Sequence, residues 1–338
     1  MGAATTPGAA GARPGSDPLS AVDPARRLLR PGAHSHPRGA LLRALLAPAT
    51  GRPPLTTAVV HPCDAVSLGG ALQAAAAGLI VPIFVGPRAR IEAVARAAGA
   101  SLSGLRLVDT PHSHAAAARG VELVRAGEAE AILKGSLHTD ELMAEVVRAD
   151  TGLRTERRVS HVFVLDVPHY PKPLFVTDAA INIAPDLDTK RDIVQNAIDL
   201  CHALGIDRPK VAILSAVETV NPKIPSTLDA AALCKMADRG QIRGGLLDGP
   251  LAFDNAVSVE AARTKDIVSP VAGDADVLVA PDLESGNMVA KQLVYLADAL
   301  IAGLVLGARV PIMLTSRADD ELSRLASCAL ALLYRKHG

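Results

Sequence analysis

Short apolar runs alternate with alanine-rich segments of helical length along the chain from about residue 55 onward. The runs predict buried strands at 56–60, 80–85, 105–108 and 131–133, with helices between them near 65–77, 89–98 and 114–126. Regular alternation of strand and helix is typical of a parallel sheet that helices cover on both faces. The first part of the chain is therefore predicted to be an α/β unit.

A second series of runs follows the first. It predicts strands at 161–167, 174–177, 211–214, 244–247 and 277–280, and helices near 189–204, 226–238 and 258–264. Only a short, proline-containing segment joins 161–167 to 174–177, which is too short for a crossover helix. These two strands are therefore predicted to form an antiparallel hairpin, and the second sheet is predicted to be mixed.

The last strands are followed by polar segments. The run at 277–280 precedes a predicted polar turn at 282–287 and a predicted helix at 288–301, and a further strand at 311–314 precedes the polar residues 315–320. Ligands of open α/β sheets bind beyond the carboxyl ends of the strands. We therefore expect these two polar segments to contribute to a binding site.

Several motifs, taken in their order and spacing, resemble one known family. They are LKGSLHTDELM at 133–143, RRVSHVFVLDVP at 157–168, VTDAAINIAPDLDTKRDIVQNAI at 176–198, VAILSAVETVNPKIPSTLDA at 211–230, GGLLDGPLAFDNAVS at 244–258, PDLESGNMVAKQL at 281–293 and PIMLTSRAD at 311–319. This set is similar to the phosphate acetyltransferase and phosphate butyryltransferase family. The resemblance covers roughly residues 55–338.

The resemblance implies a two-domain α/β/α sandwich with mostly parallel sheets and an active site in the cleft between the domains. The implied first domain is discontinuous, residues 38–155 plus 300–338, and the second, inserted domain is 156–299. Residues 1–37 are rich in Ala, Gly, Pro, Ser and Thr and have no apolar period. They are predicted to be a disordered or loosely docked arm.

The activity implied by the resemblance is the reversible transfer of a short acyl group, acetyl first, between coenzyme A and inorganic phosphate. The expected small-molecule partners are acyl-CoA, phosphate and acyl phosphate. No tightly bound cofactor or metal is expected, because the chain has no dinucleotide fingerprint, phosphate loop or zinc-protease motif. The resemblance also implies a homodimer.

Charge and cysteine content narrow the other partners. The 35 basic and 35 acidic residues give a formal net charge of zero, so no broad basic surface for nucleic acid or an anionic membrane is expected. The most apolar run, 296–314, contains Asp298, Arg309 and Pro311, and so is not expected to span a membrane. Four scattered cysteines with no Cys-x-x-Cys pair, and no signal-peptide pattern, predict a cytoplasmic protein.

Ser316 and Arg317 are the first candidate catalytic residues. Ser316 is predicted to be the N-cap of the last helix, with Asp319 at the third helical position of a capping-box-like pattern. A helix N-terminus also binds anions, and an arginine there can hold a phosphate group with two parallel hydrogen bonds. The resemblance places a Ser-Arg pair in the active site at this position.

Two further clusters are candidate substrate-binding residues. Ser136, His138 and Thr139 follow the strand at 131–133, where they can form a turn and helix cap or hold phosphate through hydroxyl and backbone N–H groups. Glu284, Gly286 and Asn287 form a turn that resembles the family's Leu-Glu-x-Gly-Asn motif. There the glycine permits close approach of backbone.

The sequence departs from the acetyltransferase branch of the family in two places. That branch has a further Thr and an Arg after the motif that contains Ser136, and an Asp seven residues after the Ser of the Ser-Arg pair, where this chain has Ser323. The candidate substitutes for the Arg are Arg154, Arg157 and Arg158. Asp319 and Asp320 are the nearby acidic residues, and we favour Asp319 as a capping residue and Asp320 as the candidate base. Acyl-chain preference and the general base therefore stay open.

Alternative functions stay open as well. The enzyme alternatives are a phosphate butyryltransferase and an acyl-carrier-protein phosphate acyltransferase. A dehydrogenase is weaker, because no nicotinamide motif is present. The non-enzyme alternative is a regulatory module that binds acyl-CoA without turnover, which the two departures favour and a free-standing chain of this length disfavours.

Overall fold

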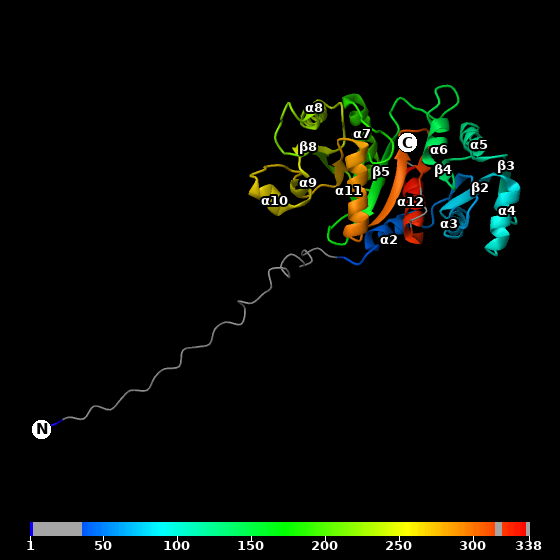
Figure 1. The fold of residues 1–338 in the computed structure, drawn as a ribbon, viewed down its shortest axis with the longest axis horizontal. Helices are drawn as coiled ribbons and strands as arrows, with labels where there is room; N and C mark the ends of the chain where they lie inside the picture. The colour runs from blue at the N-terminus through cyan, green and yellow to red at the C-terminus, as the bar shows by residue number, and fades with distance from the viewer. Residues whose placement is uncertain (3–35, 315–319, 336–338) are drawn as a thin grey trace.

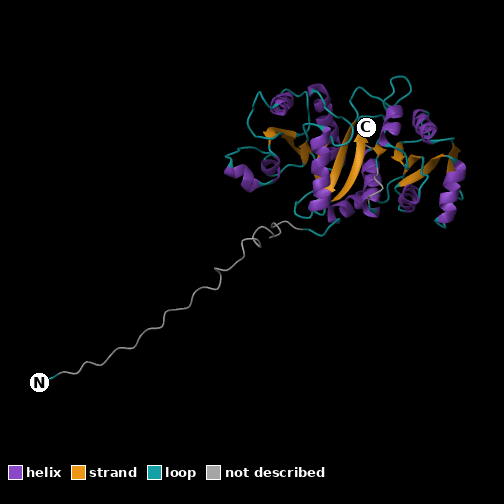
Figure 2. Ribbon diagram, in the orientation of Figure 1, coloured by secondary structure: helices purple, strands orange, loops and turns teal. Residues whose placement is uncertain are grey.

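The computed structural model describes residues 1–2, 36–314 and 320–335, and these form an eleven-stranded sheet with helices on both faces (Figures 1 and 2). The strands are β1 (Leu55–Val60), β2 (Ile80–Gly86), β3 (Arg106–Asp109), β4 (Ala131–Lys134), β5 (Ser160–Asp166), β6 (Leu174–Thr177), β7 (Lys210–Leu214), β8 (Leu246–Leu251), β9 (Val277–Val279), β10 (Leu300–Leu306) and β11 (Ile312–Met313). Their order across the sheet is β3-β2-β1-β4-β11-β10-β5-β6-β9-β7-β8.

The helices connect these strands. They are α2 (Ala40–Leu46), α3 (Ala65–Ala76), α4 (Arg88–Ala97), α5 (Ser113–Arg125), α6 (Thr139–Val146), α7 (Leu187–Ala203), α8 (Pro225–Asp238), α9 (Phe253–Val257), α10 (Val259–Thr264), α11 (Leu283–Leu296) and α12 (Glu321–Tyr334). Among the described residues no helix combines the length and the apolar character that a membrane crossing needs.

The predicted α/β class and the mostly parallel sheet are confirmed. Strands β3, β2, β1 and β4 pair in parallel, as do β6, β9, β7 and β8. The predicted hairpin is also confirmed, because β5 and β6 pair antiparallel from Val162 opposite Thr177 to Leu165 opposite Leu174. The sheet is therefore mixed, with its antiparallel pairs near the centre.

The region after α11 differs from the sequence prediction. The helix expected to reach residue 301 ends at Leu296, and β10 begins at Leu300. Asp298 has a positive φ of 54°, a backbone conformation that ends the helix before the strand begins. The apolar side chains of this region fit both a helix and a buried strand, so periodicity alone did not separate the two.

Strands β10 and β11 join the two series of strands into one sheet. β10 pairs antiparallel with β5 along seven residues, from Leu300 opposite Asp166 to Leu306 opposite Ser160. β11 lies between β10 and β4, antiparallel to the first and parallel to the second. The division into domains at 38–155 plus 300–338 and 156–299 stays a prediction, because the described sheet continues across both parts.

The N-terminal part of the described chain is fastened to the end of β5. The carboxylate of Asp166, which is fully buried, accepts hydrogen bonds from the backbone N–H groups of Leu41 (2.8 Å) and Leu42 (3.3 Å) and lies 2.7 Å from His36 Nε2. Residues 3–35 of the predicted arm lie outside the described residues. The described fold therefore includes His36, just inside the predicted boundary at residue 37.

The two faces of the sheet are covered differently. One face carries a single apolar cluster to which α2, α3, α4, α7, α8 and α12 contribute. The other face carries two separate clusters, one under α5 and α6 and the other under α9 and α11. A strip of the central strands β5 and β10 lies between these two clusters, and the candidate site lies over it.

Candidate active site

A central cleft of about 550 Å³ opens over this strip, between the start of α6 and the start of α11. Its lining residues are Lys134, Leu137, His138, Thr139, His161, Phe163, Ala179, Ala180, Leu283, Asn287 and Leu314. A side pocket of about 220 Å³ shares Phe163 and Asn287 with the cleft and is also lined by Lys291, Tyr295, Asp320 and Ser323. The two hollows together follow α11 toward its C-terminal end.

The residues after β4 divide between structural and cleft-lining positions. The hydroxyl of Ser136 donates to the backbone oxygen of His61 (2.9 Å) and accepts from the backbone N–H of Cys63 (3.1 Å). This side chain thus ties the end of β4 to the end of β1, and it is not among the residues that line the cleft. His138, which precedes the first residue of α6, and Thr139 do line it.

Lys134, the last residue of β4, also lines the cleft, and the sequence analysis did not single it out. Its ammonium group donates to the backbone oxygens of Leu137 (3.1 Å) and Gly135 (3.3 Å). These bonds hold a positive charge beside the N-terminus of α6, where backbone N–H groups also favour anions. The start of α6 therefore combines the ammonium group of Lys134 with backbone N–H groups, next to the carboxylates of Asp140 and Glu141 in the first turn.

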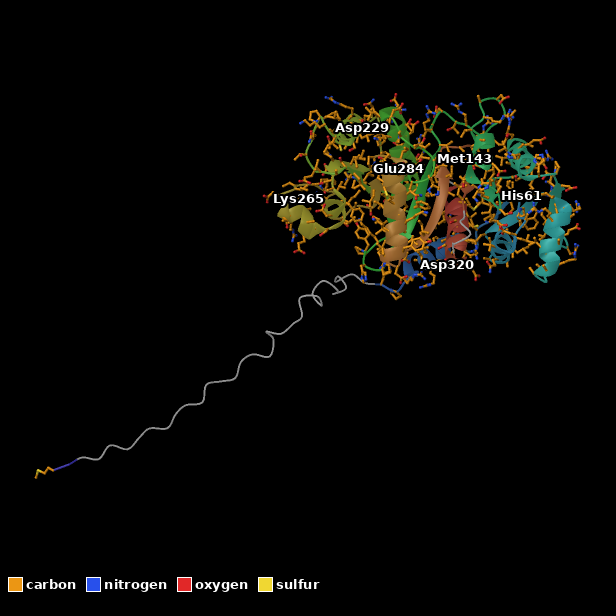
Figure 3. The ribbon with its side chains drawn as sticks, in the orientation of Figure 1. His61, Met143, Asp229, Lys265, Glu284 and Asp320 are labelled. Atoms are coloured by element: carbon orange, nitrogen blue, oxygen red, sulfur yellow. The ribbon has the colours of Figure 1, made fainter. Side chains whose placement is uncertain are left out.

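The predicted polar turn at 282–287 is wrong, because these residues form the N-terminus of α11. Asp282 caps the helix, and its Oδ1 accepts from the backbone N–H of Ser285 (2.8 Å). An Asp at this position satisfies N–H groups that the helix leaves unpaired, so the helix starts earlier than the apolar period indicated. Glu284 is exposed in the first turn of α11. It lies away from Asp320, which is near the other end of this helix (Figure 3).

Asn287 is the residue of this motif that reaches the ligand-sized space. It lines both the cleft and the side pocket, and its Nδ2 donates to the backbone oxygen of Ala179 (3.1 Å). Gly286 is buried and permits the expected close approach, since a Cβ there would lie 2.6 Å from the backbone oxygen of Asp178. Glycine at 286 therefore sets how closely α11 packs on the loop that follows β6.

The loop that follows β6 is held in place by Asp178. Its side chain is 2% exposed and accepts from the backbone N–H groups of Ala180 (2.9 Å), Ile181 (3.1 Å) and Asn182 (3.2 Å), and from Asn182 Nδ2 (2.6 Å). Burial raises the pKa of this carboxyl group, and the hydrogen bonds oppose that effect. The carboxylate therefore fixes the loop whose Ala179 and Ala180 line the cleft.

The predicted caps of the last helix are wrong. Asp320, not Ser316 or Asp319, is the N-cap of α12, and its Oδ1 accepts from the backbone N–H of Ser323 at 2.8 Å. Asp and Ser are about equally good N-caps, so the sequence could not decide between them. Asp320 and Ser323 both line the side pocket.

Ser316, Arg317 and Asp319 lie outside the described residues. The residues that flank this segment are placed, however: Leu314 lines the central cleft and Asp320 lines the side pocket. Arg154, Arg157 and Arg158 line a different hollow beyond Ile181 and Asn182, and none of the three lines the central cleft.

His161 on β5 is a second cleft residue that the sequence analysis did not single out. Its side chain is 1% exposed, and its Nδ1 has no hydrogen-bond partner among the described residues. Burial lowers the pKa of this imidazole to about 3, so the ring is neutral at physiological pH. The signal available in the sequence was a histidine inside an apolar strand, a pattern that does not separate a core residue from a binding residue.

Comparison with known proteins agrees with this architecture. The family model for phosphate acetyl/butaryl transferases matches residues 110–332. A phosphate acetyltransferase of Rhizobium meliloti is 64% identical over 86% of this chain and 92% of its own length. A phosphate butyryltransferase of Clostridium acetobutylicum is 43% identical over 76% of this chain and 85% of its own.

A solved structure gives the same result for the fold. The crystal structure of a branched-chain phosphotransacylase from Enterococcus faecalis superposes with a TM-score of 0.72, at 30% identity, over 84% of this chain and all of that one. The fold and these similarities define an α/β transferase class with a mixed, mostly parallel sheet. The chain belongs to the phosphate acetyl/butaryl transferase family.

Substitution of Gly286 tests the packing of α11 on the loop that follows β6. We expect Gly286→Ala to lower the free energy of unfolding by about 1–3 kcal/mol, because the new methyl group forces α11 away from Asp178. Gly69→Ala in α3 is the matched control, since a Cβ there meets nothing within 4 Å. The control should be stabilised by up to about 1 kcal/mol, because alanine has the higher helix propensity. Urea unfolding that ranks the two variants equally would contradict the packing argument.

Proposed function

We propose that this chain catalyses the reversible transfer of a short acyl group between coenzyme A and inorganic phosphate, with acetyl as the preferred group. The observation that carries the proposal is the 64% identity with a phosphate acetyltransferase along most of both chains. The cleft geometry supports it. Two adjoining hollows along α11 suit a long substrate such as coenzyme A, and the wall at the start of α6 includes the ammonium group of Lys134.

The proposed roles follow from where each residue lies. Thr139 and the N-terminus of α6 hold phosphate or the phosphoryl end of the acyl phosphate, and Asn287 contacts the substrate from the opposite wall. Ser136 acts by holding the ends of β1 and β4 in place, since its hydroxyl is already bonded to both sides. Binding both substrates in one cleft supplies the advantage of proximity.

Ser316 and Arg317 complete the proposed site. Ser316 hydrogen-bonds the thiol or the developing oxyanion, and Arg317 binds phosphate or acyl phosphate with two parallel hydrogen bonds. Glu284 acts on the helix dipole of α11 rather than on the substrate, because it is exposed and does not line either hollow. No tightly bound cofactor or metal is part of the proposal. A cytoplasmic location is proposed with it, from the four cysteines, none of which forms a disulfide.

One assay separates the main alternatives. Purified protein is mixed with CoA and acetyl, propionyl or butyryl phosphate, and thioester formation is followed by absorbance. Highest turnover with acetyl phosphate supports the proposal. Highest turnover with butyryl phosphate supports a butyryltransferase, for which the 43% identical relative is the reason to test. Binding of acyl-CoA without turnover of any of the three supports the regulatory module.

Arg317 is predicted to be needed for turnover. We expect Arg317→Ala to lower catalytic efficiency with acetyl phosphate by on the order of 10²–10³, the usual effect of removing one donor from a preorganised site. Arg317→Lys should also be poor, because an ammonium group cannot reproduce the two parallel hydrogen bonds. Steady-state kinetics on both variants, with melting curves as the folding control, decide the matter. Unchanged efficiency of the alanine variant excludes this role.

Asp320 has two proposed roles, as helix cap and as general base, and two substitutions separate them. Asparagine preserves the cap, so Asp320→Asn should keep the wild-type stability and lose roughly 10²–10⁴ in turnover if the carboxylate is the base. Asp320→Ala should lose about 1 kcal/mol of stability in addition. Activity of the Asn variant should recover toward pH values near the pKa of a free thiol, about 8.5, where the thiolate forms unaided. Full turnover by Asp320→Asn at all pH values rules out this base.

The homodimer is proposed from the family resemblance alone. The apolar residues of α12 do not support it, because Leu330, Leu332 and Leu333 are buried within the chain itself. Light scattering at micromolar concentration should nevertheless give twice the 34.9 kDa mass of one chain. A monomer mass under these conditions contradicts the proposal.

A further inference from the structure

Among the described residues, His161 lies on the strip of β5 and β10 between the apolar cluster under α5 and α6 and the cluster under α9 and α11. Phe163, two residues along β5, points to the same face and packs with its ring at 71° to the imidazole, the centroids 4.3 Å apart. Both side chains line the central cleft. His161 is therefore part of the cleft floor, between the wall at α6 and the wall at α11.

The neighbouring strand leaves room for this ring. Gly303 of β10 pairs with Phe163, and a Cβ at position 303 would lie 2.7 Å from His161 Nε2. Any side chain at 303 would thus displace the imidazole. Yet the ring that occupies this space has no hydrogen-bond partner for its Nδ1 among the described residues, although its side chain is 1% exposed. A buried polar group without a partner inside a ligand-sized cleft indicates a partner on the ligand.

We propose that His161 donates a hydrogen bond from its neutral imidazole to the carbonyl oxygen of the acyl group, and so stabilises the oxyanion that forms during transfer. This inference rests on the proposed function and assigns to it a catalytic residue on the cleft floor. A neutral imidazole has one N–H to donate and can act as an electrophile toward a carbonyl group without carrying a charge.

The surroundings of the ring favour the acyl carbonyl over the phosphate. Leu137, Phe163, Leu283 and Leu314 make this part of the cleft apolar, which suits a short acyl chain. Positive charge, which the phosphate dianion needs, lies instead at Lys134 beside α6. The acyl group therefore lies over the floor, and the phosphoryl group lies toward the α6 wall.

The transfer step then proceeds as follows. An oxygen of HPO₄²⁻ adds to the carbonyl carbon of acyl-CoA, a C–O bond forms, and the carbonyl π electrons move to the oxygen that His161 contacts. When these electrons return, the C–S bond breaks and the proton that phosphate carried ends on the sulfur of CoA. The products are acyl phosphate and CoA, and His161 keeps its own proton throughout.

Three substitutions at position 161 test the proposal. His161→Leu removes the donor and should lower kcat for acetyl transfer by on the order of 10²–10³. The KM values for acetyl-CoA and phosphate should change by less than about threefold, because the bond strengthens only in the transition state. His161→Asn and His161→Gln place an amide N–H near Nδ1 and Nε2, and the better of the two should recover at least about tenfold over leucine.

Folding and position effects are controlled separately. His161→Leu should melt at or above the wild-type temperature, because leucine leaves no unpaired polar atom in this space. His202→Gln is the matched control, since this histidine of α7 bonds the backbone oxygen of Gly244 (2.8 Å) and lines neither hollow. It should retain wild-type kinetics. A folded His161→Leu variant with kcat close to that of the wild type overturns the assignment, and so does an equal loss in all three variants.

The same experiment distinguishes this inference from the proposed function. Turnover by the wild type together with full turnover by His161→Leu removes the role of His161 and leaves the function intact. If the wild type turns over no acyl phosphate, the function fails, and the contact is then read from ¹⁵N-histidine NMR with acetyl phosphate and with acetyl-CoA as probes. Movement of the signals that His161→Gln removes supports the contact, and unmoved signals overturn it.

Discussion

The antiparallel pairing of β5 with β10 is the constraint on which the rest of the structure depends. Seven consecutive residue pairs of β5 and β10 join the parallel strands that end in β4 and β11 to the parallel strands that begin with β6. Because successive side chains of a strand point to opposite faces, a shift of one residue in this pairing would turn His161 and Phe163 away from the cleft. It would also move Gly303 from the position where its missing side chain makes room for the imidazole.

The cleft results from unequal covering of the two faces. On one face, the central strands pack against the covering helices through a continuous apolar cluster. The other face has separate clusters under α5 and α6 and under α9 and α11, and the strip between them carries a histidine and an aromatic ring instead of a covering helix. Polar residues at the cleft edges mainly fix backbone. Hydrogen bonds join the side chains of Asp178, Ser136 and Asp320 to neighbouring backbone N–H or C=O groups. Substitutions at these positions therefore change the geometry of the cleft walls.

The sequence predicted what depends on local pattern. Alternation of apolar runs gave the parallel strands, and the short connection before Leu174 gave the hairpin with β5. It did not predict β10, because the apolar residues around Leu300 fit both a helix and a strand, and only the pairing with β5 selects the strand. The two helix starts were misplaced because several Asp and Ser residues near each start can serve as caps. His161 was missed because its importance depends on Gly303 and on where the flanking helices lie. Both are far from residue 161 in the sequence.

The neutral state of His161 bears on how the proposed site could accelerate transfer rather than only bind substrate. A cationic group on the cleft floor would attract phosphate and acyl phosphate in the ground state as well as in the transition state, and binding both equally lowers KM without raising kcat. A neutral donor directed at the carbonyl oxygen interacts weakly with a thioester and strongly with an oxyanion. Its burial, which keeps the pKa near 3, therefore serves the chemistry, because it prevents the ring from becoming a second phosphate site. Charged groups then lie in the walls of the cleft. The hydrogen bond from His161 on the floor becomes strong only when the carbonyl oxygen becomes negative.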